Sequence, residues 1–292
     1  MLLVTGAAGL SGSAVVREFA NQKLPVRALV RNLDRAGAFV DLPTVEVVGG
    51  DMTKPGELTA ALEGVDRTLM ISTADPQMLE TQCTFIDACK AAGVSHIVKF
   101  SGAEAGFDPM KFRFTRMHEE IEDYLERSGL AWTHLRPSQF MQVYLRETPT
   151  IVNNGTLLLP MADGSLAPID VEDIAKIAVG VMKGSGHEGK SYAMTGPEAL
   201  TMSAIADRIS IAIGSPVRYV AIRPEDRRDA LVRAGVPTFL VEGLYEQALE
   251  RLRNPKAQVC LDTHRQFGVK PTTFAEFAHR NAARFRGERA AA

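Results

Sequence analysis

Short apolar runs rich in β-branched residues alternate with longer amphipathic segments through the first half of the chain. The runs occupy residues 2–5, 25–30, 45–50, 67–72, 96–101 and 131–137, and the helix-like segments occupy residues 12–21, 55–62, 79–92 and 116–128. Strands that are joined through helices form right-handed crossovers and a parallel sheet. The runs lack a regular polar–apolar alternation, as expected of strands that are covered on both faces. The pattern predicts an α/β fold with a doubly wound parallel sheet and helices on both faces.

A glycine-rich turn separates the first apolar run from the first amphipathic segment. The stretch TGAAGLSG places Gly6, Gly9 and Gly12 at intervals of three residues. Gly6 permits a tight turn, Gly9 lets a pyrophosphate approach the backbone, and Gly12 lets the helix pack close to the sheet. The amides and the positive dipole end at the start of the helix favour phosphate groups. The turn therefore predicts a dinucleotide site of the Rossmann type, and a plain strand–turn–helix is the alternative.

The ends of the second and third strands indicate which dinucleotide is bound. Arg31 stands where an acidic residue would bond the ribose of NAD, and its guanidinium suits the 2′-phosphate of NADP. Arg35 lies one helical turn further on and is a candidate helper. Asp51 is placed to accept a hydrogen bond from the adenine amino group, with Met52 against the ring. NADP(H) is favoured and NAD(H) is possible; the alternatives are a surface arginine for Arg31 and a helix N-cap for Asp51.

The regular alternation of strands and helices ends at about residue 150. Two extended pieces flank a turn at residues 162–164, and helices and short strands follow, up to a closing helix over residues 273–285. We predict a dinucleotide-binding domain, and a smaller α/β C-terminal subdomain that binds the substrate. The dinucleotide-binding domain is expected to comprise residues 1–154, with residues 167–195 returning to it. The substrate-binding subdomain is expected to comprise residues 155–166 and 196–292.

Charge and composition limit the class of partner. The chain has 292 residues, a formal net charge of -2 and a pI of about 6.3, so no net positive field gathers nucleic acid or an anionic membrane. No signal peptide and no membrane-spanning apolar stretch are evident. Three cysteines suit a reducing compartment, and the histidines show no paired metal-ligand spacing. We expect a cytoplasmic protein without a metal, as a monomer or a dimer.

Several stretches together resemble a known family. They are TGAAGLSG, LVRN, GGDMT, RMHEEIEDYLERSGLAWTHLRPSQFMQ and APIDVEDIA. Over residues 1 to about 285 the chain is similar to the NmrA-like branch of the atypical short-chain dehydrogenase/reductase superfamily. This branch includes reductases of quinones, azo dyes and triphenylmethane dyes, isoflavone-type reductases, and redox-sensing regulators that bind a dinucleotide without turnover. The resemblance implies a Rossmann fold, and its motifs identify no substrate.

The resemblance also implies which residues line the cofactor. Those that would hold the pyrophosphate are Thr5, Gly6, Ala7, Ala8, Gly9, Leu10, Ser11 and Gly12. Those that would line the riboses and the nicotinamide are Ser72, Thr73, Ala74, Ser101, Gly102, Pro137, Ser138 and Phe140. All of these residues are expected at the carboxyl ends of strands, where open α/β sheets bind their ligands.

The Tyr-x-x-x-Lys pair of typical short-chain dehydrogenases is missing. None of the five tyrosines is followed four residues later by a lysine. The matching helix instead carries His118 and Glu122, which share a face. Either His118 orients or protonates the substrate with the support of Glu122, or the two form a structural pair; Ser101 is the other candidate catalytic residue. Without a built-in acid, the favoured acceptors are quinones, cationic dyes, imines and other conjugated systems that accept hydride directly.

Aromatic and methionine side chains indicate an apolar substrate wall. We expect Phe107, Phe140, Met141 and Tyr144 to contact a flat aromatic acceptor, although each also suits an ordinary core. The sequence thus predicts an NAD(P)H-dependent oxidoreductase that transfers hydride to a quinone, dye, imine or other conjugated aromatic acceptor. The rival is a non-catalytic, NADP-sensing regulator that binds a protein partner, which the missing tyrosine fits equally well.

Overall fold

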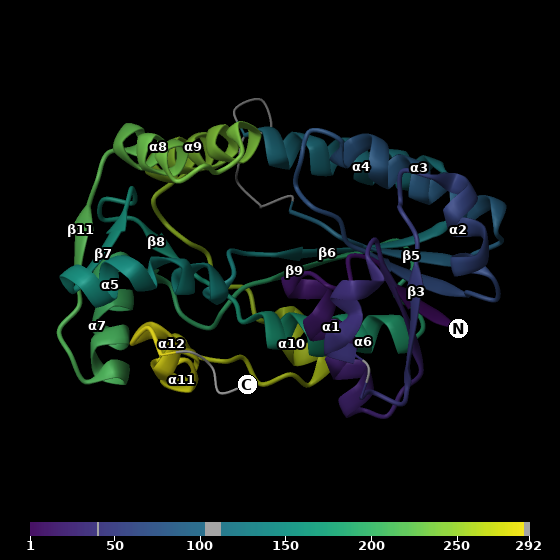
Figure 1. Ribbon diagram of the computed structural model, residues 1–292, viewed down its shortest axis with the longest axis horizontal. Helices are drawn as coiled ribbons and strands as arrows, with labels where there is room; N and C mark the ends of the chain where they lie inside the picture. Colours follow the sequence, from purple (N-terminus) through teal and green to yellow (C-terminus); the bar gives the residue numbers. More distant parts are fainter. Residues whose placement is uncertain (40, 103–111, 289–292) are drawn as a thin grey trace. The chain divides into compact units, whose positions relative to one another are not determined.

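The computed structural model describes residues 1–39, 41–102 and 112–288 and divides into two compact units (Figure 1). Unit 1 consists of Met1–Ala103, Phe114–Arg136 and Val171–Ala193. Unit 2 consists of Glu104–Arg113, Pro137–Asp170 and Met194–Ala292. Each unit is therefore assembled from segments that are far apart in the sequence.

Unit 1 is built on a seven-stranded sheet with the strand order β3-β2-β1-β4-β5-β6-β9. The strands are β1 (Leu2–Val4), β2 (Val26–Val30), β3 (Val45–Gly49), β4 (Arg67–Met70), β5 (His96–Phe100), β6 (Ala131–Pro137) and β9 (Lys190–Met194). The neighbouring pairs from β3 to β6 are parallel. The order reverses beside β1, because the chain runs outward to β3 and then returns to place β4 on the other side. The prediction of a doubly wound parallel sheet is confirmed.

Helices cover both faces of this sheet (Figure 1). They are α1 (Leu10–Asn21), the 3-10 helix η1 (Leu33–Phe39), α2 (Pro55–Leu62), α3 (Met78–Ala91), α4 (Arg113–Arg127) and α6 (Val171–Lys183). Helices α1 and α6 pack against each other on one face, and α2 packs against α3 on the other. The inner strands β1, β2, β4 and β5 are largely buried on both sides as a result, which explains why their sequences do not alternate, whereas the edge strands β3 and β9 keep exposed positions.

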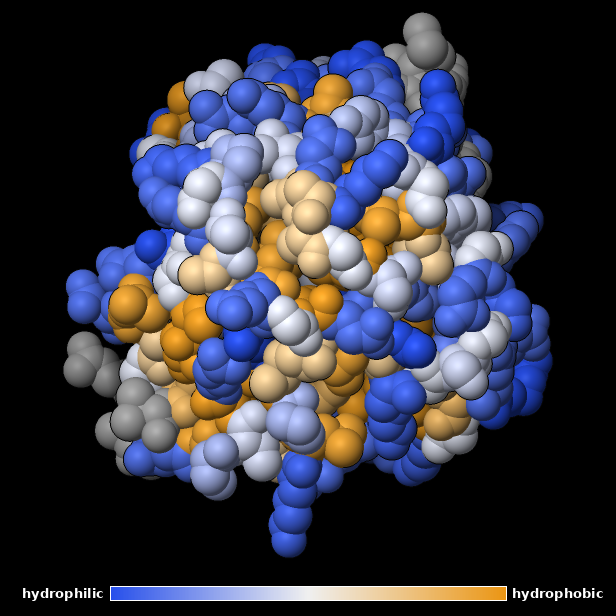
Figure 2. All heavy atoms as spheres, turned by 90° about the vertical axis from the view of Figure 1, so that its right-hand side faces the viewer, coloured by the Kyte–Doolittle hydropathy of each residue, from blue (hydrophilic) through white to orange (hydrophobic). Residues whose placement is uncertain are grey.

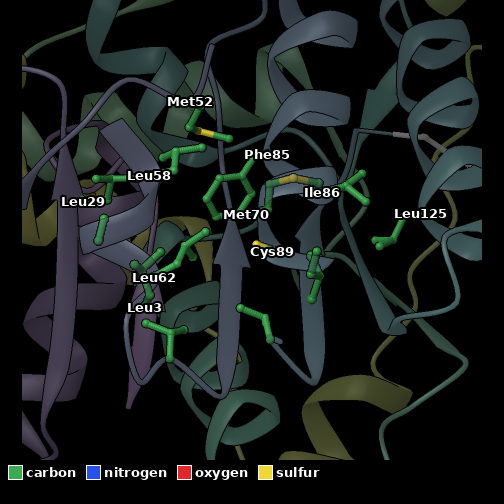
Figure 3. Close-up of a cluster of buried hydrophobic side chains, with 14 of the residues drawn as sticks. Leu3, Leu29, Met52, Leu58, Leu62, Met70, Phe85, Ile86, Cys89 and Leu125 are labelled. Atoms are coloured by element: carbon green, nitrogen blue, oxygen red, sulfur yellow. The ribbon is translucent and has the colours of Figure 1, made fainter. Parts of the chain in front are cut away.

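The core beneath α2 and α3 is a continuous apolar cluster (Figure 3). Phe85, Ile86 and Cys89 project from one face of α3, as their spacing predicts, and none of the three is exposed to solvent. Phe85 lies near the sheet residue Met70, and Ile86 lies on the side toward Leu125 of α4. Fully buried aromatic and aliphatic side chains of this kind each contribute roughly 1.5–3 kcal/mol of transfer free energy, so this packing holds the strand ends that bear the site.

Unit 2 is a smaller α/β unit with two short sheets. Its elements are η2 (Met141–Glu147), α5 (Thr148–Asn154), β7 (Thr156–Leu159), β8 (Ser165–Leu166), β10 (Leu200–Thr201), α7 (Met202–Ile213), β11 (Arg218–Ala221), α8 (Pro224–Arg233), α9 (Thr238–Arg253), α10 (Asp262–Phe267), α11 (Phe274–Arg280) and α12 (Ala282–Phe285). Strand β7 pairs with β11 in parallel, and β8 pairs with β10 in antiparallel orientation. The two extended pieces around residues 162–164 are therefore joined by a turn but pair with later strands.

The segment after β6 joins unit 2 earlier than the sequence predicts. The predicted first domain runs to residue 154, whereas the boundary between the units falls after Arg136. Residues 141–154 form η2 and α5, and α5 packs on β7 and α12 of unit 2. The predicted closing helix over residues 273–285 is likewise interrupted, because Asn281 lies between α11 and α12.

The surface mixes polar and apolar residues. Figure 2 shows one side of the molecule, on which hydrophilic residues surround a central area of hydrophobic ones. Scattered apolar residues are ordinary on a globular surface. Within residues 1–39, 41–102 and 112–288, no helix combines the length and the hydropathy that a membrane crossing requires.

Candidate functional site

The turn between β1 and α1 is held so tightly that side chains do not fit at two of its glycines. Gly6 adopts a left-handed conformation with φ of +58°, and a Cβ there would lie 2.8 Å from the carbonyl oxygen of Ile71. A Cβ on Gly12 would lie 2.3 Å from the carbonyl oxygen of Gly6. Thr5 ties the turn to β4, since its hydroxyl donates to Ile71 O at 2.7 Å and accepts from Ile71 N at 2.8 Å. The absence of side chains is thus a requirement of the local backbone packing.

The start of α1 presents a positive helix end. Gly9 is the N-cap and provides no side-chain cap, and the first turn contains no acidic residue. The amides of Ala7 and Gly9 donate to Leu29 O and Gly6 O at 3.3 and 2.9 Å, and that of Ser13 donates to Gly9 O, so an anion would be met by the amides of residues 10–12. A bare turn that leads into an uncapped helix fits the pyrophosphate of a dinucleotide. The assignment of residues 5–12 to the cofactor remains a prediction.

The predicted adenosine end lies at the carboxyl ends of β2 and β3. Arg31 is exposed directly after β2, and Asp51 follows β3. The pKa of Asp51 lies below its usual range, mainly because the Thr53 amide donates to its carboxylate at 2.9 Å, with a smaller contribution from the charge of Arg31. The N-cap of α2 is Lys54, so the alternative that Asp51 caps this helix is wrong: its carboxylate is turned back onto Thr53.

Met52 and Arg35 are the other two predicted contacts of the adenosine. Met52 is 7% exposed and packs in the core cluster beneath α2, which leaves little of its side chain to lie against a base. The side chain of Arg35 lies outside the part of the chain that the structure describes. Beyond β4, Ser72 accepts a hydrogen bond from Gln82 of α3 at 2.8 Å, and Thr73 and Ala74 continue the same loop. These residues line the expected edge of the sheet, and their contacts with a cofactor remain predictions.

A buried polar network lies beyond β5 in unit 1. Lys99, in β5, is completely buried, and its ammonium nitrogen lies 2.9 Å from Nδ1 of His118 and 3.2 Å from Oγ of Ser101. Both candidate catalytic residues therefore contact one lysine. Gly102 lies against the opposite edge of the imidazole, because a Cβ there would be 2.7 Å from Nε2 and Cδ2 of His118. The four residues form a compact group at the carboxyl end of β5.

Glu122 belongs to the same network but is not the direct partner of His118. Its carboxylate pairs with Arg136 of β6, with Arg136 Nε 3.1 Å from Oε1, and it accepts a hydrogen bond from Ser101. The predicted His118–Glu122 pair is thus replaced by a chain that runs through Ser101 and Lys99. The i, i+4 spacing brings the two side chains to one helix face, but an arginine from the neighbouring strand offers the carboxylate a stronger partner.

Burial controls the pKa values in this group. Desolvation lowers the pKa of Lys99 from 10.5 to about 7, against the opposing effect of Glu122. Desolvation and then the charge of Lys99 hold the pKa of His118 well below its usual range. Burial alone would raise the pKa of Glu122, but its hydrogen bond from Arg136 and the charges nearby lower it. The network therefore holds a neutral imidazole next to a lysine that can exchange its proton near neutral pH.

The sequence pattern did not single out Lys99 or Arg136. Lys99 follows three apolar or buried positions in HIVKF, a run that was predicted to be covered on both faces. A lysine inside such a strand is unusual, because charged side chains are almost never fully buried without partners. That signal was available, but the identity of its partners required the structure.

The predicted substrate residues Phe140, Met141 and Tyr144 lie in unit 2, together with the cofactor candidates Pro137 and Ser138. Ser138 donates to Ala167 O at 2.6 Å, and Phe140 forms a bridge with Ile169. Met141 is buried in the core of unit 2. Phe107 lies outside the described residues.

Of the three described substrate candidates, only Tyr144 lines a pocket of unit 2. The pocket has an apolar wall and several polar groups, and its lining includes Val143, Tyr144, Leu159, Met161, Met202, Leu231 and Leu244, with Gln139, Glu147, Arg227 and Arg251. The Tyr144 ring packs edge-on against Phe274 with the ring centroids 5.3 Å apart, and burial raises its phenol pKa. An apolar pocket with a few polar groups is typical of sites for flat organic ligands.

No metal centre emerges from residues 1–39, 41–102 and 112–288, where no group of three or more His, Cys, Asp or Glu side chains is arranged to hold a metal ion.

The chain is similar to known proteins over nearly its whole length. It is 37% identical to the NAD(P)H azoreductase of Xenophilus azovorans over 287 residues, which cover 98% of this chain and 99% of the azoreductase. It is 33% identical to a (4-alkanoyl-5-oxo-2,5-dihydrofuran-3-yl)methyl phosphate reductase of Streptomyces griseus, covering 99% of this chain and 100% of that protein. The fold superposes on the NADPH-dependent quinone oxidoreductase QOR2 of Escherichia coli, solved with NADPH, with a TM-score of 0.85 at 29% identity, covering 96% of this chain and 99% of that one. The family model described as the NmrA-like family matches residues 1–278, and the chain therefore belongs to the NmrA-like family.

Proposed function

We propose that the protein is an NAD(P)H-dependent reductase that uses NADPH preferentially and transfers hydride to a conjugated aromatic acceptor such as an azo compound, a quinone or a dye. The observation that carries this proposal is the bare turn at Gly6–Gly12, which leads into an uncapped helix end. The similar proteins are an azoreductase, a dihydrofuranylmethyl phosphate reductase and a quinone oxidoreductase, and these activities support reduction as the reaction.

The cofactor, when bound, supplies the hydride. The residues expected to hold it in unit 1 are the turn at residues 5–12, Arg31 for the 2′-phosphate, and the ends of β4 and β5. Arg31 is exposed and close enough to Asp51 to influence its pKa, so a guanidinium is available at the adenosine end. His118 offers a neutral imidazole for hydrogen bonding to an acceptor, since burial and Lys99 disfavour its protonated form.

The substrate is expected to be flat and largely apolar. The pocket of unit 2 that Tyr144 lines has leucine and methionine side chains on its walls, and such walls adapt to aromatic rings of different outline. Such walls would orient the acceptor, and orientation of the reactants supplies a large part of the rate enhancement of reactions of this kind.

The test is a spectroscopic assay of the purified protein. NADPH or NADH is mixed with azo compounds, quinones and cationic triphenylmethane dyes, and oxidation of the cofactor is followed at about 340 nm. We expect turnover with at least one acceptor class and a lower KM for NADPH than for NADH. Tight binding of NADPH without oxidation by any acceptor would instead favour the regulator that senses NADP and binds a protein partner.

A further inference from the structure

The buried lysine of β5 occupies a position that a structural role does not require. Lys99 points into the interior of unit 1 with no exposed surface, while Ser101, two residues later, is 2% exposed. Burying an ammonium group is costly, and an apolar side chain would fill the same space without that cost. A lysine in this place therefore calls for a role in which its charge matters.

We propose that Lys99 is the proton source for acceptors that must be protonated when they are reduced, and that His118 passes this proton on. The proposal rests on the proposed reductase function and gives it the acid that the missing Tyr-x-x-x-Lys pair would supply. Lys99 acts only through His118, which is half-buried whereas Lys99 is fully buried, so the lysine is a positioning residue and a proton reservoir.

The geometry defines the direction of the relay. An ammonium group has three hydrogens and no lone pair, so a protonated Lys99 can only donate to Nδ1 of His118, 2.9 Å away. A neutral imidazole that accepts at Nδ1 carries its own proton on Nε2. The Nε2 edge lies beside Gly102, where the lack of a side chain leaves room for the ring. The lysine thereby sets the tautomer in which His118 donates from Nε2.

For an azo acceptor, the proposed transfer of one hydride and one proton balances in atoms and electrons. The hydride that bound NADPH supplies adds to one nitrogen of the N=N group, and the π-electron pair moves to the other nitrogen. That nitrogen takes the proton from Nε2 of His118, while Nδ1 takes a proton from Lys99, which becomes a neutral amine. The azo group is reduced to the hydrazo form, and NADPH is oxidised by two electrons. A solvent proton taken up at Nε2 and the return of the Nδ1 proton to Lys99 restore the starting state.

Burial favours release of this proton, because desolvation lowers the pKa of Lys99 more than the charge of Glu122 raises it. The groups that face Lys99 are His118 and Glu122 from α4 and His134 and Arg136 from β6. Arg136, which is partly exposed, already pairs with Glu122, so a protonated Lys99 places a second positive charge near the same carboxylate. His134 has Glu126 as its own partner at 3.1 Å. When Lys99 loses its proton, the cost of burying a charged ammonium group is removed. The pKa of about 7 places this proton exchange near neutral pH.

The first arm of the test is independent of activity. In protein labelled with ¹⁵N-histidine, the His118 resonances, assigned by their loss in His118→Gln, report which ring nitrogen carries the proton. At pH 6 we expect the proton on Nε2 in the wild type and a mixture of both tautomers in Lys99→Met. A proton on Nδ1 of the wild type at pH 6 would overturn the proposal.

The second arm compares two acceptors in the same variants. An azo dye needs a proton during reduction, whereas a cationic triphenylmethane dye becomes neutral on accepting hydride. In Lys99→Met we expect kcat for the azo dye to fall by about 100-fold, in line with the usual contribution of general acid catalysis, and kcat for the cationic dye to change less than about threefold. Lys99→Arg keeps the charge and the donor but does not release a proton, so it is expected to lose azo reduction as well.

The controls separate this proposal from the proposed function. Lys90→Met removes an exposed lysine of α3 and should leave kcat unchanged for both the azo dye and the cationic dye. In the wild type, kcat for the azo dye should fall as the pH rises through about 7, and kcat for the cationic dye should not follow it. Equal losses with both dyes in Lys99→Met, or no loss with either, would refute the relay. Failure of every acceptor to oxidise NADPH would refute the reductase function, and with it the relay, whatever the tautomer of His118.

Discussion

The pH dependence of folding stability tests the burial of Lys99 without any ligand. The pKa of its ammonium group falls from 10.5 to about 7 in the folded protein, mainly through desolvation. Because the folded-state pKa is the lower one, the unfolded chain binds more protons between these two values, and the free energy of unfolding rises with pH in that window. Each unit of pKa difference corresponds to about 1.4 kcal/mol. Between pH 7 and 9 this one group should therefore add about 2 kcal/mol to the free energy of unfolding.

The variant Lys99→Met removes the titrating group and keeps a linear side chain of similar length. The free energy of unfolding of both proteins is measured in urea at pH 7, 8 and 9. We expect the variant to be the more stable protein at pH 7, and the difference between the two to shrink by about 2 kcal/mol by pH 9. Lys90→Met, on the surface of α3, should follow the wild type at every pH. Parallel pH profiles for Lys99→Met and the wild type would show that Lys99 keeps an ordinary pKa, and the reasoning from burial would be wrong.

Three further variants test the turn, the cofactor preference and a helix cap. Arg31→Ala should raise Kd for NADPH by at least about tenfold and leave Kd for NADH nearly unchanged, since one charge-assisted phosphate contact is lost; equal changes measured by calorimetry would remove Arg31 from the phosphate site. Gly12→Ala places a Cβ 2.3 Å from Gly6 O and should lower Tm and abolish dinucleotide binding, whereas Gly56→Ala, with nothing within 4 Å, should do neither; an unchanged Tm for the first variant would contradict this packing. Thr273→Ala removes the capping box of α11 and should lower the free energy of unfolding by about 1 kcal/mol in urea titrations; no loss would mean that solvent replaces the cap.

Local sequence signals located most of the elements. The amphipathic spacing over residues 79–92 corresponds to α3 at Met78–Ala91, and the helix predicted over residues 171–184 is α6 at Val171–Lys183. These segments were predictable because a helix buries one face at a fixed period, which the sequence displays directly. The closing helix was not predicted as two pieces, because the interruption at Asn281 carries no strong breaker such as proline or glycine.

The sequence did not predict which distant strands and side chains pair with each other. Strands β7 and β8 are adjacent in the chain, yet they pair with β11 and β10. Helix spacing indicated that His118 and Glu122 share a face of α4, but it does not reveal that β6 supplies Arg136 to the carboxylate. Pairings of this kind depend on which strand is placed next to which helix. The same local pattern is compatible with several such arrangements, so it does not predict the pairing.

By itself, the sequence determined the alternation of strands and helices, the parallel sheet, and a glycine-rich turn ahead of the first helix, since these follow from hydrophobic period and backbone sterics within short windows. The tertiary structure alone decided that Lys99 is buried between Ser101 and His118 and that Glu122 pairs with Arg136. The physical reason is that the charge state of a side chain depends on the solvent it loses and on the partners it meets, and both are set by segments that are distant in the chain.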